Sequence, residues 1–177
     1  LGDVYKRQVQ KLYENQSGRK ISLPYGVEAL RCYGGVKLQK KTEEILERTE
    51  EAQVLNMEGD TIWENETFRT CIFPYSGEKI LEKKYTKWLD CDKINCELSV
   101  RTRRSGDYMI VNQSGGRKKL TRCMIDDKIP GEIRQEIPLV AAKDEILWIV
   151  GGRISERYKI TSQTEKAVSY THLRAHE

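Results

Sequence analysis

The N-terminal part of the chain carries the pattern of one helix followed by a small antiparallel sheet. Val9–Tyr13 has the apolar spacing of the last turns of a helix, which Ser17-Gly18 ends. Three short segments then alternate or cluster apolar residues, and Pro24-Tyr25-Gly26 and Gly34-Gly35 separate them as turns. We therefore predict strands at Lys20–Leu23, Val27–Tyr33 and Val36–Gln39.

The C-terminal part mixes strand patterns with one helical pattern. Lys118–Ile129 has apolar residues close to helical spacing, and Pro130 ends it. Trp88 and Trp148 sit in apolar runs, so we expect both in a core. From Leu98 onward the predicted order is β-β-α-α-β-β-β, an α+β fold whose strand order stays open. The predicted segments are strands at Thr67–Phe73 and Lys79–Tyr85, a turn at Tyr85–Asp90, strands at Leu98–Arg101 and Tyr108–Val111, the helix, a short helix at Gly131–Gln135, a hairpin of Pro138–Ala142 and Ile146–Val150, and a strand at Arg157–Ile160.

Charge divides the chain. Residues 41–66 hold two basic and nine acidic residues, whereas residues 97–134 hold nine basic and five acidic ones. The acidic stretch has good helix formers but only a thin apolar face, so it is an exposed helix or a mobile linker, and its charge serves solvation. We expect residues 9–40 to end a preceding, substrate-binding domain and residues 67–167 to form a C-terminal domain with its core at 85–164.

The two ends look foreign to the rest. Asp3–Gln8 can be encoded by GAT GTG TAT AAG AGA CAG, and the reverse complement, read two bases in, gives Val168–Leu173. Both ends therefore resemble one sequencing adapter translated from opposite strands. We predict that residues 1–8 and 168–177 carry no packed structure of functional meaning. Both histidines, His172 and His176, fall there, so no histidine chemistry is expected.

Several kinds of chemistry lack support. The five cysteines are odd in number, and Cys91-x4-Cys96 has no second pair at zinc-like spacing, so reduced thiols are expected. No apolar run reaches the roughly 18 residues of a membrane helix. We expect a cytoplasmic protein without membrane contact, and an interior or tail piece of a longer chain. The aspartates Asp90, Asp92, Asp126 and Asp127 lack a calcium-loop pattern, and no metal is assigned to them.

Positive charge gathers around two glycine turns. One is Arg101-Thr-Arg103-Arg104-Ser-Gly106-Asp107, and the other is Gly116-Arg117-Lys118-Lys119-Leu120. With Lys128-Ile-Pro130, Pro138-Leu139 and Trp148–Ser155, they resemble, in order and spacing, the C-terminal domain of the bacterial tRNA(Ile)-lysidine synthetase family. The resemblance covers about Tyr85–Thr164, and a weaker one covers the stretch from Gln16 through Leu23-Pro24 to Tyr33.

This resemblance implies a fold and a function. The fold would be a compact, sandwich-like domain related to one in the β-subunit of phenylalanyl-tRNA synthetase. The family activates the wobble cytidine of tRNA(Ile) with ATP and Mg, and lysine then displaces AMP. Its ATP loop, Ser-Gly-Gly-x-Asp-Ser, belongs to an N-terminal domain. Here Ser114-Gly115-Gly116 is followed by Arg117-Lys118-Lys119, without the Asp and Ser, so we expect no cofactor in this chain and no activity of this chain alone.

A binding function remains, because Lys and Arg supply most of the sequence-independent affinity for nucleic acid. We expect Arg117, Lys118 and Lys119 at a helix start, where anions would relieve an unfavourable dipole, although a solvated basic turn explains them too. Arg101 and Arg103 share a strand face and form either a phosphate clamp or a pair with Asp107. Arg153 and Arg157 are also open to internal ion pairs. The candidate tRNA-binding residues are Arg101, Arg103, Arg104, Arg117, Lys118, Lys119, Lys128 and Arg153.

Three functional classes stay open. The favoured class is the tRNA-binding part of a lysidine synthetase. A second is a protein-interaction or dimerisation module, including a homodimer, whose basic residues serve solubility. A free-standing enzyme is disfavoured, because no nucleophile–base pair and no nucleotide loop can be named.

Overall fold

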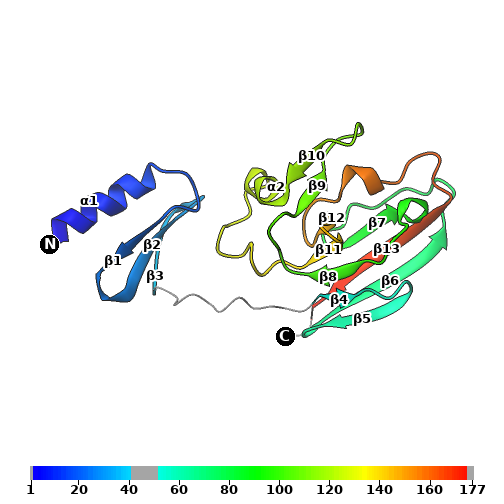
Figure 1. Cartoon of the computed structure of the whole chain (residues 1–177), viewed down its shortest axis with the longest axis horizontal. Coiled ribbons are helices and arrows are strands. Elements are labelled where there is room, and N and C mark those ends of the chain that lie inside the picture. The colour runs from blue at the N-terminus through cyan, green and yellow to red at the C-terminus, as the bar shows by residue number, and fades with distance from the viewer. Residues whose placement is uncertain (1, 41–51, 175–177) are drawn as a thin grey trace. The chain divides into compact units, whose positions relative to one another are not determined.

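A computed structural model describes residues 2–40 and 52–174 of the 177-residue chain. The chain divides into two units, one of residues 1–49 with Met124–Gln135 and one of residues 50–123 with 136–177. Figure 1 shows helix α1 and the first three strands in the first unit, and two larger sheets in the second. None of the helices in the described residues is long and apolar enough to cross a membrane.

The first unit is the helix and three-stranded sheet that the N-terminal pattern predicts. Helix α1 spans Gly2–Tyr13 and buries Leu12. Strand β2 is central in an antiparallel sheet of order β1-β2-β3, and its Ala29 and Leu30 are almost fully buried. The strands are β1 (Lys20–Leu23), β2 (Val27–Cys32) and β3 (Gly35–Lys40). The prediction for this part is confirmed.

One sheet of the second unit has six strands in the order β10-β9-β12-β11-β8-β4. All neighbours are antiparallel except β9 and β12, which meet in parallel. Strands β11 and β12 are buried along their whole length, as central strands must be. The bounds are β4 (Gln53–Val54), β8 (Ser99–Arg101), β9 (Tyr108–Ile110), β10 (Arg117–Lys119), β11 (Leu139–Ala142) and β12 (Glu145–Ile149).

The other sheet has four antiparallel strands in the order β5-β6-β13-β7. Its members are β5 (Gly59–Trp63), β6 (Glu66–Pro74), β7 (Thr86–Asp90) and β13 (Lys166–Leu173). Strands β4 and β5 fall inside the stretch predicted as an acidic linker, so a linker reaching residue 66 is wrong. Thr61 and Trp63 are buried in β5, whereas Ile62 between them and Asp60 and Glu64 on either side are exposed. Residues 41–51 of that stretch lie outside the described residues.

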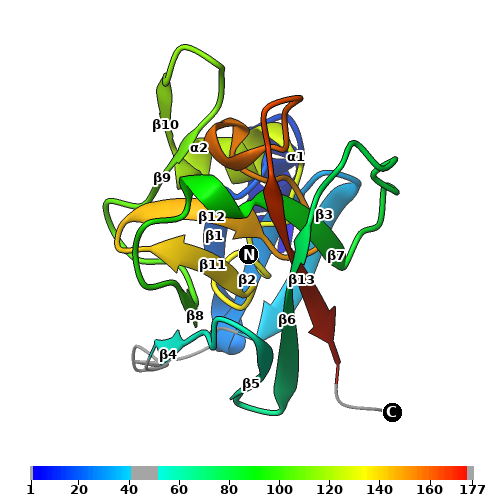
Figure 2. The same cartoon turned by 90° about the vertical axis from the view of Figure 1, so that its right-hand side faces the viewer.

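The two sheets share one hydrophobic core. Phe68, Leu89 and Val168 of the four-stranded sheet lie in the same buried cluster as Val140 and Trp148 of the six-stranded sheet. Figure 2 shows the two sheets as separate layers of the second unit. The predicted α+β, sandwich-like fold is therefore confirmed, with Trp148 in the core. The expectation that Trp88 is also a core residue is wrong, because Trp88 is only half-buried and lies outside this cluster.

Residues 2–8 and 168–173 belong to regular elements, which corrects the expectation that no packed structure would be found at the two ends. Gly2–Gln8 continue helix α1, and residues 168–173 complete β13, which lies between β6 and β7. Val168, Tyr170 and His172 are buried on one face of β13. The reason is the alternation of Val-Ser-Tyr-Thr-His-Leu, which suits a strand with one buried face. The adapter origin of these residues stays a prediction.

Four other segments differ from the predicted pattern. Helix α2 spans only Leu120–Asp126, because the residues before it pair with β9. Gly131–Gln135 forms turns rather than a helix, and the predicted strand after Ser155 is a 3-10 turn at Glu156–Tyr158. Residues 79–85 are irregular, and the strand begins at Thr86, where a turn was predicted.

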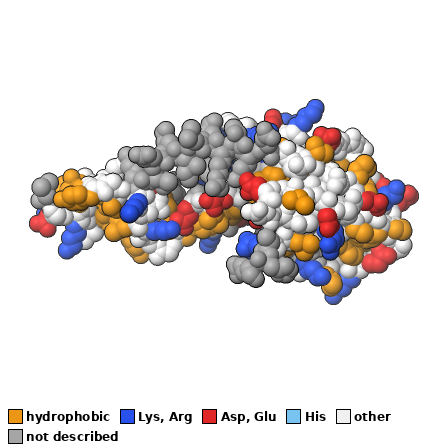
Figure 3. All heavy atoms as spheres, turned by 90° about the horizontal axis from the view of Figure 1, so that it is seen from below, with side chains coloured by type: hydrophobic (Ala, Val, Ile, Leu, Met, Phe, Trp, Pro, Cys, Tyr) orange, Lys and Arg blue, Asp and Glu red, His pale blue; other side chains and the backbone are white. Residues whose placement is uncertain are grey.

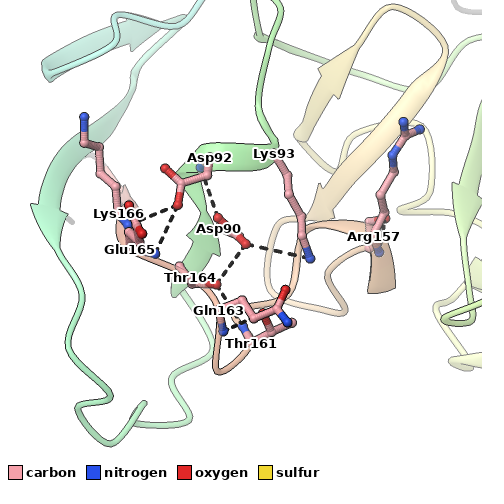
Figure 4. A network of polar contacts seen from close by, with 10 residues as sticks. Asp90, Asp92, Lys93, Arg157, Thr161, Gln163, Thr164, Glu165 and Lys166 are labelled. Carbon is pink, nitrogen blue, oxygen red and sulfur yellow. Dashed lines mark hydrogen bonds and ion pairs between the residues drawn. The ribbon is translucent and has the colours of Figure 1, made fainter.

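The loop that leads into β13 is fastened by two aspartates. Asp90 accepts hydrogen bonds from the Thr164 hydroxyl at 2.8 Å and from the Asp92 amide at 3.0 Å (Figure 4). Asp92 in turn accepts from the amides of Glu165 and Lys166 at 3.1 and 3.3 Å. These carboxylates therefore organise the 3-10 turn at Cys91–Lys93 and the entry to β13.

We predict that β13 is essential to the second unit. Deleting residues 168–177 removes the buried side chains of Val168 and Tyr170, which together contribute at least about 3 kcal/mol, and leaves β7 without a partner and β6 paired only with β5. Because domains are stable by only about 5–15 kcal/mol, the truncated chain should lose most of its cooperative transition in thermal melts followed by circular dichroism.

The matched truncation is at the other end. Removing residues 1–8 leaves Leu12, the buried residue of α1, in place and should change the melting temperature by only a few degrees. A chain that ends at Ala167 and still melts like the parent would show that β13 contributes little.

Candidate nucleic-acid interface

A basic hairpin projects from the second unit. Strands β9 and β10 and the loop 111–116 form it, and it stands out from the body of the unit in Figure 1 and Figure 2. Arg117 faces Ile110 in the register, Lys118 faces Met109, and Lys119 faces Tyr108. Arg117 and Lys119 therefore share one face of the hairpin, and both are exposed, whereas Lys118 points to the other face and is half-buried.

Tyr108 supports the guanidinium of Arg117. The guanidinium carbon lies 4.5 Å from the centre of the Tyr108 ring, a cation–π geometry. Such stacking orders the flat guanidinium while its N–H groups stay directed outward. Arg117 is thus held ready for an anionic partner.

The loop of the basic hairpin is closed by Asn112. Its Oδ1 accepts hydrogen bonds from the Gly116 amide at 2.7 Å and the Ser114 hydroxyl at 2.8 Å, and its carbonyl accepts from the Gly115 amide. Gly115 has a φ of +85°, a conformation that favours glycine. The amides of the Gly-Gly pair are therefore used within the loop, and the turn joins two strands.

A buried ion pair lies at the base of the hairpin. Both Arg101 and Asp107 are almost fully buried, and their side chains form two parallel hydrogen bonds of 2.8 and 2.7 Å. Arg101 also donates to the carbonyls of Lys143 at 2.7 Å and Thr102 at 3.0 Å. Of the two roles open to Arg101, the structure shows the pair with Asp107, so its prediction as a phosphate ligand is wrong.

Asp107 joins the two basic clusters. Its carboxylate accepts from the Arg104 amide at 2.8 Å, and its carbonyl accepts from the Leu120 amide at 2.9 Å. Arg103 reaches Thr121 Oγ1 at 3.5 Å, at the start of α2. The arginine turn, residues 102–106, and the end of β10 are therefore fixed to one residue, with the Arg104 side chain exposed.

The other predicted residues lie elsewhere. Arg153 is half-buried and lines a groove of about 470 Å³ with Trp88, Lys87 and Lys159. Lys128 is exposed, has a φ of +57°, and belongs to the first unit. Neither residue belongs to the basic hairpin or to the arginine turn.

Arg157 makes an internal ion pair, one of the two alternatives open to it. It contacts Glu145 at 3.2 Å, and Tyr158 donates to the same carboxylate at 3.2 Å. Burial, with the nearby Glu145 charge, raises the pKa of Tyr158 to about 12. Tyr158 therefore stays a neutral donor that keeps the Glu145 carboxylate hydrogen-bonded.

Charge elsewhere is mixed. On the face drawn in Figure 3, basic and acidic side chains are interspersed over the second unit, as on ordinary solvated surfaces. Within the described residues, no group of three or more His, Cys, Asp or Glu side chains is arranged to hold a metal ion. The basic hairpin and the arginine turn contain the two clusters of positive charge that the sequence pattern indicates.

The second unit matches a known domain. The model of the TilS substrate C-terminal domain matches residues 98–170, which include both basic clusters and the buried pair. Residues 98–170 belong to that family. A crystal structure titled as the TilS C-terminal domain superposes with a TM-score of 0.51 at 26% sequence identity, covering 64% of this chain and 87% of that one.

Longer relatives extend the similarity over most of the chain. The tRNA(Ile)-lysidine synthase of Caldanaerobacter subterraneus subsp. tengcongensis is 36% identical over 92% of this chain. Those of Clostridium tetani and Clostridium perfringens are 32% and 33% identical over 92% and 90% of it. The chain spans about a third of the length of these relatives, 35 to 36%, and corresponds to their C-terminal part.

The sequence pattern did not reveal the role of Tyr108, which it predicts only as a strand residue and which stacks under Arg117 in the basic hairpin. The spacing between Tyr108 and Arg117–Lys119 is compatible with a hairpin, which would bring Tyr108 and Arg117 together. The prediction of a helix from Lys118 onward excluded this pairing.

We predict that the buried pair is a major source of stability. Asp107→Ala leaves the Arg101 guanidinium buried without its carboxylate, which should lower the free energy of unfolding by about 3–5 kcal/mol in urea denaturation. Arg104→Ala, which removes only an exposed side chain of the arginine turn and keeps the Arg104 amide that donates to Asp107, should change it by about 0.5 kcal/mol or less. Equal effects of the two variants would contradict the role given to Asp107.

Proposed function

We propose that this chain is the C-terminal, tRNA-contacting part of a tRNA(Ile)-lysidine synthase, which joins lysine to the wobble cytidine of tRNA(Ile) at the expense of ATP. The similarity to such enzymes over nine-tenths of the chain supports the assignment. Lysine, ATP and Mg would bind the part of the enzyme outside this chain. A tRNA substrate would place the enzyme in the cytoplasm.

The basic hairpin is the observation that best supports contact with tRNA. Arg117 and Lys119 present two cations on one exposed face, and the hydrogen bonds to Asp107 hold the arginine turn beside the end of β10. Cations placed close together repel one another, and a polyanion relieves that repulsion while releasing counterions. Phosphates of a folded RNA supply such a partner without base-specific contacts.

A homodimer formed by pairing strand β10 with β10 of a second copy is less well supported. Strand β10 is an edge strand of its sheet, and unpaired edges invite strand addition. However, Arg117, Lys118 and Lys119 are all cationic, and charge on an edge strand opposes pairing with an identical strand. A homodimer through this edge is therefore the weaker proposal.

We predict that tRNA binds the chain with an affinity that falls steeply with salt. Each lost phosphate contact lowers the slope of log affinity against log salt by about 0.7 to 0.9. Arg117→Ala with Lys119→Ala should therefore flatten the slope by roughly 1.5 units in filter-binding or anisotropy titrations, with unchanged circular dichroism.

The matched control removes the same charge from another surface. Lys79 and Lys83 are exposed in the irregular segment before β7, and the Lys79→Ala, Lys83→Ala variant should leave the slope nearly unchanged. Equal slopes for the parent and the hairpin variant would show that the basic hairpin is only a solvated turn. A chain that binds no tRNA at low salt would refute the proposed function.

The chain alone should not bind ATP specifically. The Gly115 and Gly116 amides already donate to Asn112, so they cannot cradle a phosphate as the glycine-rich loops of nucleotide sites do. Isothermal titration with Mg-ATP should give no saturable heat. Micromolar binding that Gly115→Ala abolishes would overturn this expectation.

A further inference from the structure

The β1–β2 hairpin of the first unit presents a tyrosine at its tip. The turn runs from Pro24 to Val27, closed by a hydrogen bond from the Val27 amide to the Pro24 carbonyl. Its central residues, Tyr25 and Gly26, have φ values of 62° and 69°. Two consecutive positive φ angles are typical of the type I′ turns that join antiparallel strands.

Tyr25 is an unfavourable residue for this position. Turns of this kind take Asn, Asp or Gly at their first central residue, because a bulky side chain with positive φ is strained. The Tyr25 side chain is also fully exposed, with a relative exposure of 101%, so the unit gains no burial from it. The strain and the exposed ring serve neither the turn nor the core of the unit.

One cation, Lys40, lies beside this tyrosine's turn. Lys40 pairs with Val27 in the sheet register, so it lies beside the turn, and it is exposed. Over Val9–Lys40 the chain has six basic and two acidic residues. An exposed aromatic ring beside cations is the combination with which proteins hold unpaired nucleotides, because the ring stacks on a base and the cations meet phosphates.

We propose that Tyr25 is a second RNA contact, whose ring stacks on an unpaired base of the tRNA while Lys40 meets a neighbouring phosphate. This rests on the proposed function. The basic excess of residues 9–40 and the position of Lys40 beside the turn favour RNA over an apolar protein surface as the partner. The turn is closed by a backbone hydrogen bond, so little backbone freedom is lost on binding.

Three variants of the whole chain test Tyr25. Tyr25→Ala removes the ring, and Tyr25→Asn removes it while relieving the backbone strain. Both should weaken tRNA binding by about 5- to 100-fold at fixed salt, the range that loss of one base–aromatic stack gives. Because stacking releases no counterions, neither should change the salt slope. Tyr25→Trp should retain the affinity, and its fluorescence should change on binding.

The Asn variant separates binding from folding. Asn adopts positive φ more readily than Tyr, so its melting temperature should equal or exceed that of the parent. Weakened binding with an unchanged or higher melting temperature therefore supports the contact. Parent-like affinity of both Tyr25→Ala and Tyr25→Asn would refute it.

Failure here is distinguishable from failure of the proposed function. If the parent chain binds tRNA with a steep salt slope and only the Tyr25 variants are neutral, the contact at the β1–β2 turn is refuted and the basic hairpin remains. If an apolar peptide or another protein, rather than tRNA, protects Tyr25, the RNA assignment of this turn is refuted.

Discussion

The ion pair between Arg101 and Asp107 is the constraint on which the basic surface depends. Two charges taken out of water are stable only when their geometry is good and their remaining donors and acceptors are satisfied. Here two parallel hydrogen bonds join them, two carbonyls accept further Arg101 donors, and the Arg104 amide donates to Asp107. Removing either partner would disturb the arginine turn and the end of β10 together.

Within residues 101–104, one arginine stabilises the fold and another is exposed for binding. Strand β8 buries Arg101 as well as Val100, and the turn that follows places Arg104 outside. The buried arginine organises the surface, and the exposed ones are available to a phosphate. The core of the two sheets supports both, because β8 and β9 belong to the sheet that packs through Val140 and Trp148.

The sequence predicts those parts of the fold that apolar alternation or a turn residue marks. Strands β1, β2, β11 and β12 lie where these signals put them. Strand β10 does not, because Arg117–Lys119 has no apolar residue and is a strand only through its hydrogen bonds to β9. Likewise β5 is hidden within acidic residues, and only its long-range pairing with β6 defines it. The choice between the two roles of Arg101 also depends on Lys143, which is distant in sequence.

Residues 168–173 form a strand because of their apolar pattern, whatever the origin of their sequence. Their apolar positions fall on one face, so they fill the gap between β6 and β7 whether or not they are native to the domain. His172 contacts Glu66 at 2.9 Å. Because the strand pattern of residues 168–173 is enough to bury His172, we assign this contact no function. Function is better sought in residues 98–123, where the family match and the basic surface coincide.

Hydrogen exchange of the whole chain, with and without tRNA, tests the central claim most directly. The account predicts that tRNA slows amide exchange in the arginine turn and in residues 111–119, while residues 79–84 exchange at the same rate in both states. Protection confined to residues 79–84 and the groove around Arg153, with the basic hairpin unchanged, would contradict it.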